Sequence, residues 1–119
     1  MNAFAHYNDK NIRWIERGAD EAFRRALMAG VPPQLRSKMH RALAAVPNPA
    51  KDLAHSRRYF GDRLDEIAER VRPLISLIDL YLRESWKLPG FRDWLNLTGY
   101  ANHYEMVKVF YEWAQMKRD

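Results

Sequence analysis

The sequence predicts an all-α fold, a compact bundle of five or six helices that forms a single domain over residues 1–119. Apolar residues recur at the three- and four-residue spacing of a helix face along most of the chain, and the two-residue alternation of a β-strand persists nowhere. Prolines and glycines interrupt this periodicity and mark the helix ends. A hydrophobic share of 47% with 29% charged residues is typical of a globular protein, and 119 residues are enough for one modest core.

The first helix is expected over residues 9–29. Asn8 and Asp9 are both good N-cap residues. The apolar face that follows continues through Gly18, so we expect one helix that is weakened at this glycine. Gly30 suits the position just after a helix, and the two prolines that come soon after it end the element.

Two more helical stretches follow. Pro33 can occupy the first turn of a helix over residues 33–46. The apolar stripe of this helix consists of Leu35, Met39, Leu43 and Val46. Residues 50–87 are helical nearly throughout, but Gly61 can end a short helix there, and Pro73 either kinks the chain or starts a new helix.

The central helix of the core is expected between Val71 and Leu82. Apolar residues spread around most sides of the helix in this stretch, and they include Leu77 and Leu80. The buried centre is predicted to consist of Leu74, Ile75, Ile78 and Leu82, with Phe23, Trp94, Phe110 and Trp113 packed around them. Aromatic side chains bury large areas, so they are expected to face this core, a partner, or both.

The chain ends in two further predicted helices, over residues 90–98 and 103–117. Gly99 is the natural C-cap of the first of them. Asn102 and Glu105, three residues apart, form a variant capping box at the start of the second.

The two C-terminal helices carry a pattern that extends over residues 91–113. An aromatic helix ends in Thr-Gly, an Asn-His pair follows, and the next helix places valine and phenylalanine three residues apart. The residues that form the pattern are Thr98, Gly99, Asn102, His103, Val107 and Phe110. This pattern resembles the C-terminal helix–turn–helix of tailed-phage scaffolding and capsid-assembly proteins, in which a glycine and a proline stand where this chain has Ala101 and Tyr104. The resemblance implies that a phage or mobile element encodes the protein.

Several classes of protein are excluded. The chain has no cysteine, which excludes disulfides and thiolate metal sites and fits a reducing compartment. The N-terminus lacks the pattern of a secretory signal, and no apolar run approaches the length of a membrane span. No catalytic, cofactor-binding or metal-binding motif is present. We therefore expect a cytoplasmic protein (in the host cytoplasm if a phage encodes it) that is not an enzyme, has no catalytic residues, cofactor or metal, and does not enter a membrane.

Positive charge is concentrated in residues 36–58. Six lysines and arginines in this segment are opposed by Asp52 alone, so the segment carries a charge of +5, equal to the net charge of the whole chain. The binding residues predicted from this segment are Arg36, Lys38, Arg41, Arg57 and Arg58. Such a patch suits an acidic protein surface, and it also suits the phosphates of a nucleic acid. A solvated surface without a partner is the third interpretation.

The last helix adds aromatic groups to this candidate site. Its core stripe consists of Met106, Val107, Phe110 and Trp113 or Ala114, whereas Tyr104, Val109 and Tyr111 lie partly off the stripe. Apolar groups on two faces favour a partner or a homodimer, although packing within the core also accounts for them. Tyr104 and Tyr111 complete the set of predicted partner-binding residues.

These observations predict a small, non-enzymatic interaction protein of a phage or mobile element. Its expected role is to bind, and so to regulate or inhibit, a protein partner with an acidic surface, such as a host enzyme or defence complex. A nucleic-acid-binding protein that uses residues 36–58 is the first alternative, although few side chains there could read bases. A capsid-assembly accessory protein is the second.

Overall fold

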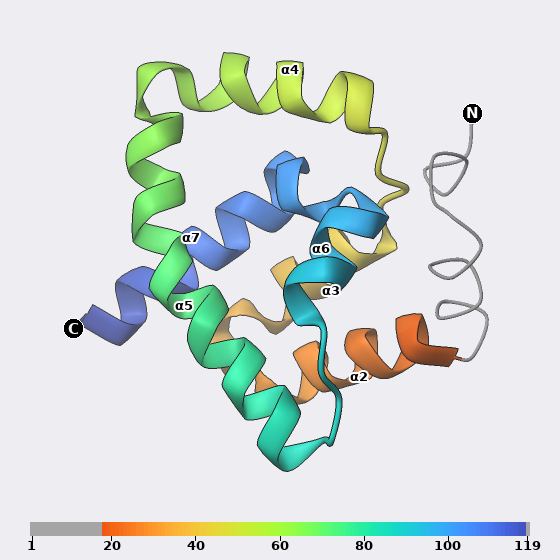
Figure 1. Ribbon diagram of the computed structural model, residues 1–119. Coiled ribbons are helices and arrows are strands. Elements are labelled where there is room, and N and C mark those ends of the chain that lie inside the picture. Colours follow the sequence, from red (N-terminus) through yellow and green to blue (C-terminus); the bar gives the residue numbers. More distant parts are fainter. Residues whose placement is uncertain (1–17, 119) are drawn as a thin grey trace.

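The computed structural model describes residues 18–118, which are helices joined by short loops and contain no β-strand (Figure 1). The α-helices are α2 (Asp20–Gly30), α3 (Arg36–Ala44), α4 (Pro49–Phe60), α5 (Leu64–Ser85), α6 (Phe91–Thr98) and α7 (Tyr104–Arg118). Single 3₁₀ turns precede α3, α5 and α7, the last with His103 in between, and they are η2 (Pro33–Leu35), η3 (Gly61–Arg63) and η4 (Tyr100–Asn102). This architecture confirms the predicted all-α class.

Helix α7 lies at the centre of the fold. It packs against α3, α4 and α5, and Figure 1 shows it passing behind α5 with α4 running above it. The prediction that the helix between Val71 and Leu82 is central is wrong, because Leu77 is 51% exposed and Leu80 is 43% exposed. Helix α5 is apolar on most sides, but one of those sides faces solvent.

The core is one cluster of buried side chains from α2, α3, α5, α6 and α7. Three of the predicted central aliphatic residues, Leu74, Ile78 and Leu82, are buried, whereas Ile75 is half-buried. The predicted aromatic residues Phe23, Trp94, Phe110 and Trp113 are all buried. Phe91 joins them, since its ring centroid lies 6.1 Å from that of Trp94 and 6.4 Å from that of Phe110. The aromatic residues therefore belong to the core, as predicted.

The first two predicted helices differ from the structure at their ends. Gly18 has a φ of 84°, in the left-handed region, and forms a π-helical turn with Ala19, so the regular α-helix α2 begins only at Asp20. The predicted start at Asn8 and Asp9 lies outside the described residues. The second helix ends at Ala44, and Val46 is 89% exposed, so the prediction that Val46 completes the apolar stripe is wrong.

Glycine and proline act differently in the long helical stretch. Gly61 has a φ of 60° and follows α4 directly, so the predicted end of a short helix at this position is confirmed. Pro73 is exposed and lies inside α5, a continuous helix of 22 residues. A proline on the solvent side costs one helix hydrogen bond without ending the helix.

The turn between α6 and α7 fixes where the last helix starts. Gly99 has a φ of 89° and ends α6, as predicted. The predicted capping box is not formed, because Asn102 belongs to η4 and the carboxylate of Glu105 accepts a hydrogen bond from the Tyr104 hydroxyl at 3.1 Å. His103 instead precedes α7, and its carbonyl accepts the hydrogen bond from the Val107 N–H at 2.9 Å.

A partly buried polar network joins α2 and α6 to the end of α3. Asp20 accepts hydrogen bonds from the Trp94 indole N–H at 2.9 Å and from Arg24 at 3.0 Å. Arg24 and the hydroxyl of Tyr100 both donate to the carbonyl of Leu43, at 2.6 Å and 2.7 Å. Burial raises the pKa of Tyr100 above its ordinary value, although the nearby Arg24 cation partly offsets this effect. Tyr100 therefore stays neutral and acts as a donor.

Replacing Tyr100 with phenylalanine is expected to lower the free energy of unfolding by about 1 kcal/mol, because the Leu43 carbonyl loses one of its two donors. Urea unfolding followed by circular dichroism measures this loss. Tyr59→Phe is the matched control, since Tyr59 is exposed and its hydroxyl is not part of this network. Equal effects of the two substitutions would contradict a stabilising role for the network.

Candidate binding surfaces

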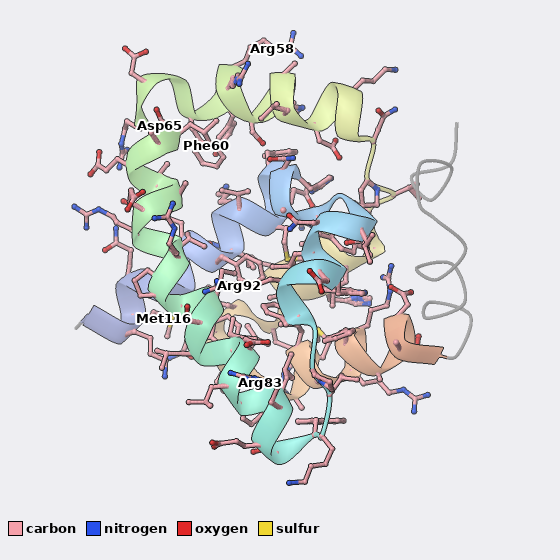
Figure 2. All side chains as sticks on the ribbon, viewed as in Figure 1. Arg58, Phe60, Asp65, Arg83, Arg92 and Met116 are labelled. Atoms are coloured by element: carbon pink, nitrogen blue, oxygen red, sulfur yellow. The ribbon has the colours of Figure 1, made fainter. Side chains whose placement is uncertain are left out.

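The residues of the basic segment lie on several surfaces of the fold. Lys38 and Arg41 of α3 line a shallow hollow beside α7. Arg57 of α4 lines a different depression, which is formed by α4, α5, the α6–η4 segment and α7. Figure 2 shows Arg58 on the outer side of α4, away from the rest of the fold. Arg36 is exposed at the start of α3 and makes no ion pair with the described residues.

We call the first of these surfaces the basic–aromatic face. It consists of Lys38, Arg41, His55, Tyr59, Tyr104 and Lys108, which come from α3, α4 and α7. Between α3 and α7 it contains a hollow of about 110 Å³. The structure therefore brings together three of the predicted partner-binding residues, Lys38, Arg41 and Tyr104.

Stacked rings hold α4 against α7 on this face. The His55 and Tyr104 rings are nearly parallel, at 6° to one another, and their centroids are 4.2 Å apart. The Tyr59 ring lies 5.4 Å from Tyr104, and the Lys108 ammonium lies 5.6 Å from the centre of the Tyr59 ring. These contacts fix the aromatic side chains before any partner arrives.

Most of the acidic groups near the basic–aromatic face already have partners. Glu112 forms an ion pair with Lys38 at 2.7 Å. The hydrogen bond to Glu105 raises the pKa of Tyr104, because the carboxylate accepts the phenol proton. A hydrogen bond with Tyr59 is the main cause that raises the pKa of Lys108, so this side chain stays charged. Arg41 makes no ion pair with the described residues, which leaves Arg41 and Lys108 as the cations available to a partner.

Tyr111, the last predicted binding residue, lies farther along α7. Its hydroxyl accepts a hydrogen bond from Arg63 at 3.1 Å, and the Arg63 guanidinium lies 6.0 Å from the centre of its ring. Tyr111 is half-buried, and Val109, predicted to lie partly off the core stripe, is buried. The second apolar face of the last helix is thus largely covered within the fold, because α7 is central.

A second depression is a groove of about 500 Å³, formed by α4, α5, the α6–η4 segment and α7. Its apolar lining includes Leu53, Leu64, Val71, Ile75, Val107 and Phe110. Three arginines also line it, Arg57, Arg72 and Arg92, whereas Asp65 is the one carboxylate there. In Figure 2, Asp65 lies at the corner between α4 and α5, and Arg92 lies farther down beside α5. We call this depression the arginine-rimmed groove.

One buried hydrogen bond fixes α4 beside this groove. The hydroxyl of Ser56, which is buried, donates to the carbonyl of Asn102 at 2.7 Å. This bond ties the middle of α4 to the turn before α7, so the position of Arg57, the next residue, is set by the fold.

Sequence reasoning missed two of the three groove arginines and several residues of the basic–aromatic face. Arg72 and Arg92 lie outside the basic segment, in regions of nearly balanced charge. Lys108 lies four residues after Tyr104, so helical spacing could have placed both on one face. No comparable signal pointed to Tyr59, because its contact with α7 depends on how two distant helices pack.

Comparisons with known proteins provide no relative: no protein-family model, curated protein or solved structure matches this chain. The resemblance of residues 91–113 to phage assembly proteins stays a prediction. Among the described residues, no group of three or more acidic or histidine side chains could hold a metal ion. None of the described helices is both long and apolar enough to cross a bilayer.

Proposed function

We propose that this protein is a non-enzymatic binding module that recognises an acidic protein partner through the basic–aromatic face. The observation that carries the proposal is the arrangement of Arg41 and Lys108 around a fixed stack of His55, Tyr59 and Tyr104. Charged groups on a partner can steer the encounter, and rigid rings offer contact area at a low entropic cost. Tyrosine and arginine are also the residues most often found at the centres of protein interfaces.

Regulation or inhibition of the bound partner is part of this proposal. A small module without its own chemistry acts by covering a surface of its partner or by changing the partner's shape. A phage origin, as predicted from residues 91–113, would make a host enzyme or defence complex a suitable partner. The same resemblance keeps a capsid-assembly accessory role as an alternative.

Charge reversal on the basic–aromatic face is expected to weaken partner binding. In the double variant Arg41→Glu/Lys108→Glu, Kd for the partner should rise at least about tenfold, mainly through a slower association rate. The partner is first captured from nuclease-treated bacterial lysate on immobilised wild-type protein, then purified and measured by surface plasmon resonance.

The matched control is Lys51→Glu/Arg58→Glu, which makes the same change of charge on exposed residues of α4. This control should bind the partner as the wild type does. Equal losses in the two double variants would mean that net charge, not this face, determines binding. Such a result would contradict the proposal.

Nucleic-acid binding is favoured by the mixture of cations and aromatic rings, but the ring geometry argues against it. Proteins that bind single strands offer free ring faces on which bases stack. Here one face of Tyr104 is covered by His55, and Lys108 lies over Tyr59. We therefore expect no distinct gel shift with duplex or single-stranded DNA at physiological salt. A shift that weakens steeply with salt would instead support the nucleic-acid alternative.

A further inference from the structure

We propose that the arginine-rimmed groove is a second binding site, which accepts an acidic amphipathic helix of another protein. This site is separate from the basic–aromatic face, because it lies on the other side of α4 and shares no residue with that face. The proposal rests on the apolar lining of the groove, on its three arginines, and on its position between helices.

The lining offers apolar area that the fold itself leaves uncovered. Leu53, Leu64, Ile75 and Val107 line the groove, and each is only half-buried. Phe110 and Val71 continue the same surface into the core. A volume of about 500 Å³ lies within the range of about 300–1,000 Å³ that is typical of ligand sites. Covering this area with apolar side chains of a partner would remove it from water, which favours binding.

The cations around the opening come from three different helices. Arg57 belongs to α4, Arg72 to α5 and Arg92 to α6, so positive charge surrounds the apolar lining on several sides. Within the described residues Arg57 has no ion pair. The hydrogen bond of Arg92 goes to the neutral hydroxyl of Ser76, so its charge is not neutralised there.

Arg72 and Asp65 change this balance little. Arg72 pairs with Glu69 at 3.0 Å, but both side chains are largely exposed, and exposed pairs of this kind are weak enough to exchange partners. Asp65 is the one carboxylate of the groove lining. The electrostatic complement of this site is therefore a ligand with several carboxylates beside its apolar groups.

An amphipathic helix combines these features. Its apolar side chains at positions i, i+3, i+4 and i+7 form a stripe that enters a groove between helices, and flanking glutamates would reach the arginines at the edge. A nucleic-acid strand would satisfy the cations but would leave the apolar lining uncovered.

A synthetic helical peptide tests the proposal directly. The probe has about 14 residues, or roughly four turns, with leucine at i, i+3, i+4 and i+7 and glutamate at the flanking positions. Fluorescence anisotropy of the labelled peptide measures its affinity for the full chain. We expect micromolar binding that weakens about tenfold when glutamine replaces the glutamates and is lost when serine replaces the leucines.

Variants of the groove and of the outer face of α4 form a matched set. Arg57→Glu should weaken peptide binding about tenfold or more, whereas Arg58→Glu, with the same charge change on the next residue, should alter it less than about twofold. Ala68→Trp places a large ring in the groove from an exposed position of α5 and should block the peptide. Thermal unfolding followed by circular dichroism verifies that each variant folds. If the tryptophan variant does not fold, the comparison of Arg57→Glu with Arg58→Glu still tests the site.

Several outcomes would overturn the proposal. Equal losses from Arg57→Glu and Arg58→Glu would show that the peptide responds only to net charge. Unchanged binding in a folded Ala68→Trp variant, or no binding by the wild type, would exclude the groove. A change of molecular mass in sedimentation of the groove variants would identify a second copy of the chain as the occupant. Loss of the peptide from Arg41→Glu/Lys108→Glu would assign it to the basic–aromatic face instead, so the two sites are distinguished.

Discussion

Replacing Trp94 with alanine is expected to lower the free energy of unfolding by about 3–5 kcal/mol. The side chain is fully buried, and its ring stacks on Phe23 with 5.3 Å between the centroids. Its indole N–H also donates to Asp20 at 2.9 Å. The substitution would therefore leave a cavity at the centre of the core and remove one donor from a partly buried carboxylate.

A loss of this size is large against the total stability of about 5–15 kcal/mol that is usual for a domain. Urea unfolding at 25 °C, followed by circular dichroism, measures the change. Trp86→Ala is the matched control, because Trp86 is 40% exposed and its indole N–H donates to the exposed hydroxyl of Tyr81. We expect less than about 1 kcal/mol for this control. Similar losses for the two tryptophans would contradict the assignment of Trp94 to the core.

The helices could be predicted from the sequence because their signals are local. Apolar spacing located each helix, and Gly61 and Gly99 marked two of the ends, where the structure has positive φ values. Val46 shows where this reasoning fails. Its spacing continues the stripe of α3, but the helix ends at Ala44 and the side chain points to solvent. The periodicity of a few residues does not show where neighbouring elements stop covering a face.

The identity of the central helix could not be predicted for a similar reason. The apolar residues of α5 surround the helix, which is typical of full burial. The structure instead surrounds α7 with α3, α4 and α5, and leaves Leu77 and Leu80 of α5 exposed. Which of two apolar helices becomes central depends on contacts between distant segments, and these contacts leave no local pattern.

The candidate sites show the same division between local and distant information. The sequence identified the excess of charge in residues 36–58, and Lys38 and Arg41 do share a surface with Tyr104. Arg57 and Arg58 are neighbours in the sequence, but successive residues point about 100° apart around a helix. One of them therefore lines the groove while the other faces away from the fold.

Replacing Phe110 with alanine is expected to cost about 3–5 kcal/mol of stability, whereas Phe110→Leu should cost only about 1–2 kcal/mol. The ring is buried, and it meets Phe91 edge-on with 6.4 Å between the centroids. It also lies 6.4 Å from the ring of Trp113, one turn along α7. The truncation would leave a cavity between α5, α6 and α7. Because α7 packs against several helices, it cannot move to fill this cavity without losing contacts elsewhere.

Phe110 also lines the arginine-rimmed groove. Its substitutions can therefore be tested for two effects, one on the stability of the core and one on peptide binding in the groove. Thermal and urea unfolding of Phe110→Ala and Phe110→Leu measure the first, and the anisotropy of the labelled peptide measures the second. Phe110→Leu should remain folded and bind the peptide with less than about a fivefold change, since leucine keeps the lining apolar. A thermal shift near zero for Phe110→Ala would place the ring outside the core and contradict the packing of α7 against α6. If the stability falls as expected and the leucine variant still binds the peptide, Phe110 acts mainly in the core. The contact surface for the peptide is then formed by half-buried aliphatic side chains such as Ile75 and Val107.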